Sequence, residues 1–224
     1  MERYHRNERA LSHAENLNLK NKSIAIVGLG GLGGYVAESF ARLGVKHITL
    51  IDDDVFEITN LNRQLNSYPD NLGQSKAQVT QKQLHRVNPD IDVKAHHTRL
   101  DDSNAQTLLS GHDIIIDCLD NIPTRLTLED AADQLRLPLI HGAIGGWYGQ
   151  VSLVMPGSRA LSKLYQNQEE KVSSYWGNPV FIVSTVASIQ VAEAVKVLIG
   201  RENTLAGKLL FIDLETPEFI VLDL

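Results

Sequence analysis

A glycine-rich segment between a short apolar run and a helical stretch constrains this chain more than any other feature. Residues 24–27 (IAIV) have the composition of a buried strand, GLGGLG follows at residues 28–33, and helical spacing of apolar residues begins at once. A strand that turns sharply into a helix leaves backbone N–H groups free at the helix start, where they can bind phosphate. Glycines are needed because a Cβ would hinder the turn, block the phosphate or hold the helix off its strand. The segment predicts a nucleotide-binding strand, loop and helix, and taken alone it favours NAD(P) or a flavin over ATP.

The rest of the chain repeats this alternation of strand and helix and then abandons it. Strands are expected at residues 47–51, 91–95, 113–118, 137–141, 150–155, 208–212 and 218–222, and helices at 34–43, 75–87, 103–109, 122–135 and 181–199. A short turn joins the last two strands, as in an antiparallel hairpin. We therefore expect an α/β fold with a Rossmann-like doubly wound sheet, parallel in its N-terminal part and with antiparallel strands at its C-terminal edge.

The length and composition fit one domain. A chain of 224 residues with 43% hydrophobic residues can bury a sizeable core. We expect a single domain over residues 1–224, with a helical N-terminal arm at 1–21, a nucleotide-binding core at 22–155, a mobile crossing loop at 156–180, and a helix followed by a β-hairpin at 181–224. The arm carries Arg3, Arg6 and Arg9 at every third position, which is typical of a solvated basic face.

Charge and cysteine content exclude several classes of protein. The net charge of −6 and the lack of a Lys/Arg cluster argue against a nucleic-acid partner. The single cysteine, Cys118, allows neither an internal disulfide nor paired Cys-x-x-Cys zinc ligands. No apolar leader is present at the start of the sequence, and Gln190, Glu193 and Lys196 interrupt the apolar helix at residues 181–199. We therefore expect no membrane span and a cytoplasmic protein.

Acidic and amide side chains follow two of the expected strands. The strand at residues 47–51 ends in three aspartates, residues 52–54, and Asp120 and Asn121 follow the strand at residues 113–118. In an open α/β sheet, ligands bind outside the carboxyl ends of the strands, so these side chains should face the same crevice as the glycine loop. Asp52 is expected to accept hydrogen bonds from a ribose, which would serve NAD and ATP equally. Asn121 can also cap the helix that follows.

Donors and cations after the second strand discriminate between the nucleotides. Asn60, Asn62, Arg63 and Lys76 are within reach of the same crevice. A nicotinamide enzyme does not need them, because the loop already holds its two phosphates and hydride transfer needs an acid or base beside the ring. Cleavage at an α-phosphate needs cations on the leaving pyrophosphate and a carboxylate for Mg²⁺. Arg63, Lys76 and Asp120 meet those needs, so ATP and Mg²⁺ are the expected ligands.

Several motifs, in consistent order over nearly the whole chain, point to a known family. They are RYHR at residues 3–6, GLGGLG at 28–33, IDDDVFEITNLNRQ at 51–64, GQSK at 73–76, NPDI at 88–91, DCLDN at 117–121 and HGAIGGWYGQV at 141–151. In these motifs the chain resembles the ThiF/MoeB/HesA family of the ubiquitin-activating superfamily. The resemblance implies an adenylyltransferase that uses ATP to adenylate the C-terminal glycine of a small ubiquitin-like sulfur-carrier protein and releases pyrophosphate.

The resemblance also implies roles for individual residues. The nucleotide site would consist of Gly28, Gly30, Gly31, Asp52, Asp54, Asn60, Arg63, Lys76, Asp120 and Asn121. Within it, Asp52 would contact the ribose and Asp120 would hold Mg²⁺. The catalytic residues would be Arg6, Arg63, Lys76 and Asp120. Arg6 would reach into the ATP site of a partner subunit, which implies a homodimer. The carrier would end in Gly-Gly, and its tail would pass the glycine-rich residues 142–149.

The chain departs from the family pattern in two places. Relatives commonly bind zinc through two Cys-x-x-Cys pairs, and some carry a cysteine in the crossing loop that becomes linked to the carrier. Residues 156–170 and 171–177 contain no cysteine. We therefore expect no zinc, and no thioester in that loop. Cys118 follows a buried strand beside the crevice, where a small apolar filler is a commoner role than a nucleophile.

Two other functions fit parts of the sequence. The glycine loop and Asp52 suit an NAD(P)-dependent oxidoreductase, and the missing carrier-linked cysteine suits a non-catalytic ATP-binding subunit of an assembly. The identity of the carrier stays open among the molybdopterin or tungstopterin, thiamin and cysteine pathways. The pterin type is favoured, because the resemblance implies that this branch dispenses with a covalent cysteine.

Overall fold

The structure is a computed structural model that describes residues 2–166 and 176–224. The strands are β1 (Ser23–Val27), β2 (His47–Ile51), β3 (Asp92–His96), β4 (Ile114–Asp117), β5 (Leu139–Gly145), β6 (Tyr148–Val154), β7 (Lys208–Asp213) and β8 (Glu218–Asp223). The helices are α1 (His13–Lys20), α2 (Gly31–Leu43), α3 (Lys76–Val87), α4 (Ala105–Leu109), α5 (Ile122–Leu135), α6 (Ala160–Tyr165) and α8 (Val180–Ile199). Short 3-10 helices are η1 (Glu2–Asn7), η2 (Ile58–Asn60) and η3 (Pro69–Asn71).

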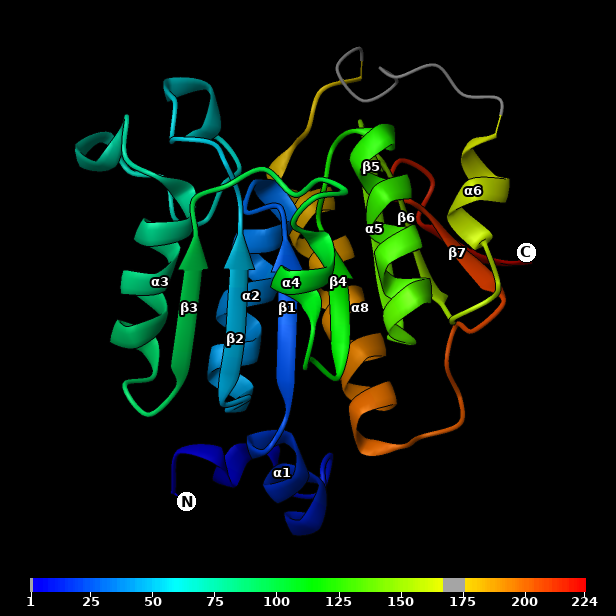
Figure 1. The fold of residues 1–224 in the computed structure, drawn as a ribbon, viewed down its shortest axis with the longest axis horizontal. Coiled ribbons are helices and arrows are strands. Elements are labelled where there is room, and N and C mark those ends of the chain that lie inside the picture. Colours follow the sequence, from blue (N-terminus) through cyan, green and yellow to red (C-terminus); the bar gives the residue numbers. More distant parts are fainter. Residues whose placement is uncertain (1, 167–175) are drawn as a thin grey trace.

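A mixed sheet forms the centre of the fold. Its strand order is β3-β2-β1-β4-β5-β6-β7-β8. Strands β1 to β5 pair in parallel, and β6, β7 and β8 pair antiparallel (Figure 1). The chain moves outward from β1 to β3 and then returns to place β4 on the other side of β1, so the topological switch point lies between β1 and β4. This confirms the expected doubly wound sheet with antiparallel strands at its C-terminal edge.

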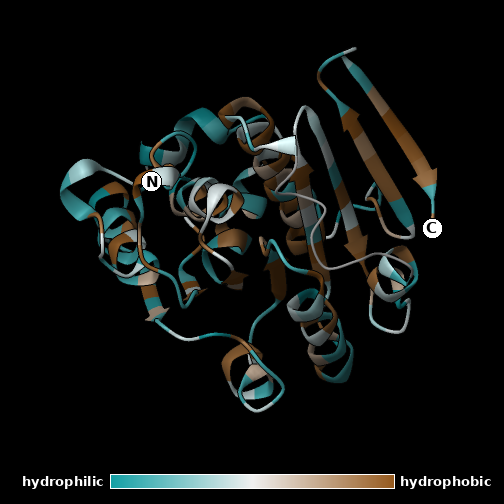
Figure 2. Cartoon of the chain, turned by 90° about the horizontal axis from the view of Figure 1, so that it is seen from above, coloured by the Kyte–Doolittle hydropathy of each residue, from teal (hydrophilic) through white to brown (hydrophobic). Residues whose placement is uncertain are grey.

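Helix α8 and the last hairpin complete the C-terminal half of the sheet. Among the described helices, only α8 is long and apolar enough to cross a membrane, and 56% of that apolar window is buried in the fold. It packs against α2, β5 and β6, and its Glu193 carboxylate accepts a hydrogen bond from Leu205 N at 2.8 Å. We therefore interpret α8 as a core helix. Figure 2 shows the largely hydrophobic β8 at the outer edge of the sheet, where its residues are exposed.

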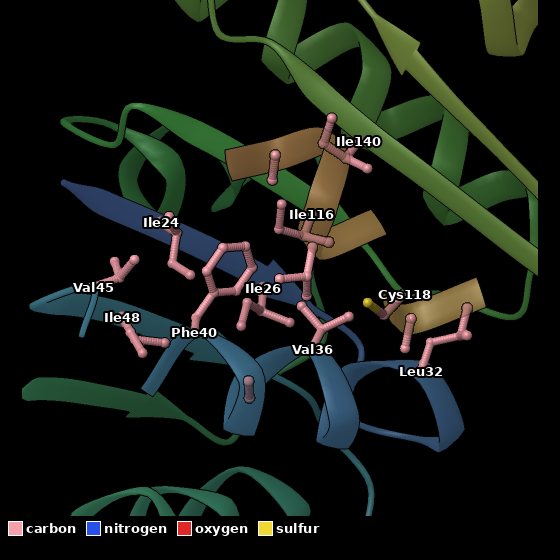
Figure 3. Packing of buried hydrophobic residues seen from close by; sticks show 14 of the residues in the cluster. Ile24, Ile26, Leu32, Val36, Phe40, Val45, Ile48, Ile116, Cys118 and Ile140 are labelled. Atoms are coloured by element: carbon pink, nitrogen blue, oxygen red, sulfur yellow. The ribbon is translucent and has the colours of Figure 1, made fainter. Parts of the chain in front are cut away.

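Alternating side chains of the central strands form an apolar core on each face of the sheet. In β1, Ile24 and Ile26 belong to one cluster, and Ala25 and Val27 belong to the other. The first cluster includes residues of α1, α2, α3 and α8, and the second includes residues of α4, α5 and α6. Figure 3 shows Phe40 of α2 beside Ile24 and Ile26. Helices thus cover both faces, as buried parallel strands require.

The structure differs from the expected organisation in two segments. The N-terminal arm is not one helix but η1 followed by α1, and Arg9 between them has a φ of 82°, which no α-helix accommodates. Residues 160–165, within the expected crossing loop, form α6, because Leu161 and Tyr165 are buried in the cluster that α5 also joins. Residues 167–175 lie outside the described residues, so the mobility of the crossing loop stays a prediction.

Candidate functional site

The carboxyl ends of β1, β2 and β4 meet at one edge of the sheet. Val27 is in register with Ile51 of β2 and with Asp117 of β4, so the residues that follow these strands lie side by side. A cavity of about 1050 Å³ opens at this edge. Ligand pockets commonly span about 300–1,000 Å³. The cavity is therefore large enough for a nucleotide and part of a second substrate.

The residues expected to bind the nucleotide all line this cavity. They are Gly28, Gly30, Gly31, Asp52, Asp54, Asn60, Arg63, Lys76, Asp120 and Asn121. Arg6 does not line it. Arg6 belongs to η1, in which Arg3 and Tyr4 form hydrogen bonds with Val87 and Asn88 at the end of α3. The N-terminal segment lies at the end of the sheet away from the carboxyl ends of β1, β2 and β4 (Figure 1). The structure thus assembles the expected site apart from the residue expected to act on a partner subunit.

The glycine loop has the close packing that its sequence predicts. Helix α2 begins at Gly31, and its cap residue Gly30 provides no side-chain hydrogen bond to the first turn. No described side chain therefore caps the N–H groups of that turn, as a helix start that binds phosphate requires. A Cβ on Gly33 would lie 1.9 Å from the carbonyl oxygen of Gly28, so only glycine lets α2 approach its strand this closely.

Asp52 connects the glycine loop to the segment after β2. Its carboxylate accepts hydrogen bonds from Leu29 N at 2.5 Å and from Asp54 N at 2.8 Å. Burial raises the pKa of Asp52, while these N–H donors and the charge of Lys76 oppose the shift. Lys76 Nζ donates to Asp54 Oδ2 at 2.8 Å, and the Lys76 side chain is 7% exposed against 66% for Asp54. An anionic ligand can therefore replace Asp54 as the partner of Lys76, because Asp54 is well solvated.

Local hydrogen bonds fix the long polar segment after β2. Asn60 Oδ1 accepts a hydrogen bond from Glu57 N at 3.0 Å. Arg63 Nη1 donates to Thr59 O at 2.9 Å and to Asn62 Oδ1 at 3.0 Å. These bonds use the carbonyl oxygen of the Asn60 side chain and one nitrogen of the Arg63 guanidinium. The remaining N–H groups of both side chains are then available as donors to a ligand in the cavity.

Asp120 and Asn121 have separate tasks. Asn121 Oδ1 accepts a hydrogen bond from Thr124 N at 3.0 Å, which confirms the predicted cap of α5. Asp120 is exposed, lines the cavity, and makes no hydrogen bond or ion pair with another described residue. Its carboxylate is therefore open to a metal ion, and Mg²⁺ typically takes only one or two protein carboxylates beside phosphate oxygens and water.

A buried polar network forms the opposite wall of the cavity, and sequence reasoning missed it. His141 Nδ1 donates to Asp117 Oδ2 at 2.6 Å, and the hydroxyl of Tyr165 donates to His141 Nε2 at 3.0 Å. Gln150 Nε2 donates to the Tyr165 hydroxyl at 2.8 Å. Arg125 Nε lies 3.5 Å from Asp117 Oδ2. Arg125, Gln150 and Tyr165 also line the cavity, so this network shapes the site.

Burial sets the protonation states around this network. Burial lowers the pKa of His141, against the opposing effect of Asp117, and raises the pKa of Tyr165 to about 12. Burial and the charge of Asp117 raise the pKa of the Cys118 thiol well above its usual range. Figure 3 shows Cys118 among apolar side chains next to Leu32. The thiol is thus protonated at neutral pH, as expected for an apolar filler.

The glycine-rich residues 142–149 serve the packing of α8 as well as access to the cavity. A Cβ on Gly142 would lie 2.3 Å from the side chain of Gln190, and a Cβ on Gly149 would lie 2.3 Å from that of Val186. Gly145 lines the cavity, and no described atom lies within 4 Å of a Cβ added there. Gly142 and Gly149 therefore also let α8 pack closely, and since Gly145 and Gly149 line the cavity, the passage of a carrier tail along residues 142–149 stays a prediction.

Comparisons with known proteins match one family over nearly the whole chain. The ThiF family matches residues 4–223. The chain is 35% identical over 202 residues to adenylyltransferase and sulfurtransferase MOCS3 of Drosophila sechellia, covering 88% of this chain and 45% of that protein. It is 34% identical over 199 residues to SAMP-activating enzyme E1 of Haloferax volcanii, covering 87% of this chain and 74% of that protein. It is 32% identical over 207 residues to molybdopterin-synthase adenylyltransferase of Escherichia coli K12, covering 90% of this chain and 82% of that protein. The chain thus spans less than half the length of the Drosophila relative.

Solved structures share the fold. The crystal structure of selenomethionine PaaA matches with a TM-score of 0.82 at 20% identity, covering 99% of this chain and 72% of that one. The crystal structure of E. coli MccB with ATP matches with a TM-score of 0.80 at 20% identity, covering 93% of this chain and 65% of that one. The family match covers residues 4–223, and the relatives named above are more than 30% identical to the chain. The chain therefore belongs to the ThiF family.

Proposed function

We propose that this protein adenylates the C-terminal glycine of a small ubiquitin-like sulfur-carrier protein with ATP and releases pyrophosphate. One observation carries the proposal: the cations of Arg63 and Lys76 line the same cavity as the glycine loop and the carboxylate of Asp120. A nicotinamide enzyme has no use for this set. The relatives named molybdopterin-synthase adenylyltransferase and SAMP-activating enzyme E1 support a carrier of this class, and a pterin-type carrier is the favoured one.

In the proposed reaction, the carrier's terminal carboxylate attacks the α-phosphorus of ATP. A bond forms between the carboxylate oxygen and the phosphorus, and the bond from that phosphorus to the pyrophosphate oxygen breaks. Arg63 and Lys76 neutralise charge on the leaving pyrophosphate, Asp52 orients the ribose, and the N–H groups at the start of α2 bind phosphate. Asp120 holds Mg²⁺, which screens phosphate charge when it is bound. The protein positions the reactants and forms no covalent bond with the carrier.

The proposal includes a homodimer in which Arg6 acts on the nucleotide of the partner subunit. Arg6 is exposed and makes no hydrogen bond or ion pair within the described parts of the chain. The N-terminal segment that carries it lies at the end of the sheet away from the cavity of its own chain (Figure 1), and Arg6 does not line that cavity. A carrier that ends in Gly-Gly, the absence of zinc and a cytoplasmic location are further predictions of the same proposal.

Carrier-dependent ATP–pyrophosphate exchange tests the proposed function. Purified protein with ATP, Mg²⁺ and a carrier ending in Gly-Gly should exchange label, and a carrier that lacks its terminal glycine should not. Asp120→Ala should lower the exchange rate by about 10²-fold or more while the protein stays folded. No exchange with any candidate carrier would contradict the proposal. ATP binding without exchange would then indicate a non-catalytic subunit, and tight NAD(H) binding without ATP binding would indicate an oxidoreductase.

A further inference from the structure

A single tyrosine attaches the segment that carries Arg6 to the ends of two helices. The hydroxyl oxygen of Tyr4 accepts a hydrogen bond from Asn88 Nδ2 at 2.9 Å, at the end of α3. Asn88 is fully buried and also donates to Ala41 O at 2.9 Å, near the end of α2. The ring of Tyr4 lies against Gly44, directly after α2. The RYHR and NPDI motifs, 84 residues apart at this contact, therefore meet in one place.

Gly44 makes room for that ring. It has a φ of +84° and forms the left-handed cap of α2, a conformation that favours glycine. A Cβ on Gly44 would lie 2.5 Å from Tyr4 Cζ and 2.6 Å from its hydroxyl oxygen. Both distances are too short for non-bonded atoms, so any other residue at this position would displace the tyrosine as well as strain the cap.

Two further contacts hold the N-terminal segment on its own subunit. Arg3 Nη1 donates to Val87 O at 2.9 Å, and Lys20 Nζ lies 5.0 Å from the centroid of the Tyr4 ring. The backbone next to Arg6 is thus attached to the folded body, whereas the Arg6 side chain is exposed. The chain therefore holds Arg6 at a defined place on its surface, and no described residue binds its guanidinium.

We propose that Tyr4 is the positioning residue for Arg6. The contact of Tyr4 with Gly44 and Asn88 fixes the segment so that Arg6 projects from its own subunit toward the nucleotide of the partner. This inference rests on the proposed function, because it gives Arg6 its target. It has a specific consequence: loss of Tyr4 in one subunit impairs the active site of the other subunit. A role confined to the stability of its own subunit would not have that effect.

Mixed dimers separate these two effects. One subunit carries Arg6→Ala, so that its nucleotide site is intact but it offers no arginine to its partner. The other subunit carries Asp120→Ala, so that its own site is inactive but its N-terminal segment is intact. Different affinity tags on the two subunits and two successive purifications isolate the mixed dimer. ATP–pyrophosphate exchange with Mg²⁺ and a Gly-Gly carrier then reports on the one competent site.

The Asp120→Ala subunit is next given Tyr4→Ala or Gly44→Ala. We expect exchange at the competent site to fall about tenfold or more, because misplacement of a catalytic group by about 1 Å is costly. Tyr4→Phe keeps the ring and loses the hydrogen bond to Asn88, so its effect should be smaller. Gly111→Ala is the matched control: Gly111 has a φ of +79°, and no described atom lies within 4 Å of its added Cβ. It introduces backbone strain without displacing a neighbour and should leave exchange unchanged.

Full exchange with Tyr4→Ala in the Asp120→Ala subunit would overturn the proposal. So would a loss seen only when Tyr4→Ala is in the subunit with the competent site, since that would assign the tyrosine to its own subunit. Two other results would refute the action of Arg6 in trans, and this role of Tyr4 with it. One is that the two tags do not co-purify, and the other is that the mixed dimer shows no exchange before Tyr4 or Gly44 is substituted. No exchange in the unmodified protein would instead refute the proposed function itself.

Discussion

The two walls of the cavity are built from differently distributed residues. The wall next to α2 and α3 takes its polar side chains from residues 52–76 and offers the backbone of the glycine loop, and hydrogen bonds to nearby backbone atoms hold several of these side chains. The wall next to α5 and α6 presents Arg125 and Tyr165 to the cavity. Behind them, Asp117 and His141 complete one buried network drawn from four separate elements. The comparison indicates that the first wall offers charge to a ligand, whereas the second fixes the shape of the site. Substitutions in the first wall should therefore reduce activity, and substitutions in the second wall should reduce stability.

Arg125→Met should have the largest effect on stability. Arg125 is the cation next to the buried Asp117 carboxylate, and it also donates to Leu119 O and to the hydroxyl of Tyr165. Removing one partner of a buried charge pair costs about 3–5 kcal/mol, because the other charge stays buried without compensation. Urea unfolding at pH 7 measures the change. Arg99→Met is the control, since Arg99 lines the same cavity but is exposed. Equal losses for both variants would contradict the structural role of the second wall.

Lys76→Ala should reduce activity with little change in stability. The loss leaves Asp54 without its partner, but Asp54 is 66% exposed and remains hydrated. We expect carrier-dependent exchange to fall by about 10²–10³-fold, as for other groups that stabilise developing charge. The free energy of unfolding should fall by less than in Arg125→Met, because the carboxylate that loses its ion-pair partner is solvated. Lys82→Ala tests whether any lysine of α3 matters, since Lys82 is exposed on the same helix and does not line the cavity. A similar exchange rate for the two variants would remove Lys76 from the nucleotide site.

The same contrast explains how much of the site the sequence predicted. Asp52, Arg63 and Lys76 are close in sequence and follow a strand end, so the rule that ligands bind at the carboxyl ends of strands brings them together. Asp117 and His141 are neighbours because β4 and β5 pair in that register, which no local pattern specifies. Tyr165 lies in a polar stretch without helical periodicity. Asp117 and His141 begin two of the family motifs, but the motifs gave neither a role. Arg125 had a local signal, because it lies one helical turn after the cap of α5.

The fold was predictable for a similar reason, with similar gaps. Each apolar strand and each amphipathic helix of the sheet has its own periodicity, so the doubly wound architecture followed from local patterns. The attachment of Tyr4 to Asn88 was not predictable, because the two residues are 84 positions apart and neither belongs to a regular pattern. The break at Arg9 depends on a single left-handed residue that is not a glycine. Contacts between distant segments therefore account for most of what the sequence did not reveal.

Acid should weaken the second wall more than the first. Burial lowers the pKa of His141, so the folded protein keeps this ring neutral while the unfolded chain takes up a proton below about pH 6.5. The free energy of unfolding should therefore fall as the pH drops from 7, by up to about 1.4 kcal/mol per pH unit from this residue. Urea unfolding at pH 7.5 and pH 5.5 measures the difference in wild type and in His141→Asn. Burial also lowers the pKa of His112. Both proteins contain His112, so its contribution to the pH dependence is the same in each. An identical pH dependence in the two would show that His141 is not the source.

Cys118→Ala should have the smallest effect, although Cys118 lines the cavity and is the only cysteine of the chain. Its Sγ lies 3.9 Å from Gln190 Oε1, and burial keeps the thiol protonated. The substitution removes one buried atom, so we expect a stability cost of about 1 kcal/mol and retained exchange.

A covalent intermediate gives this last prediction its sharpest test. The family's carrier-linked cysteine would fall at residues 171–177, and the sequence has no cysteine there. Residues 171–175 lie outside the described residues. A thioester with the carrier would therefore have to use Cys118. Incubation with ATP, Mg²⁺ and carrier should give no conjugate that runs above the free chain on a non-reducing gel and disappears with dithiothreitol. A conjugate that forms with wild type and not with Cys118→Ala would make the buried thiol a nucleophile. The second wall would then take part in the chemistry as well as fixing the shape of the site.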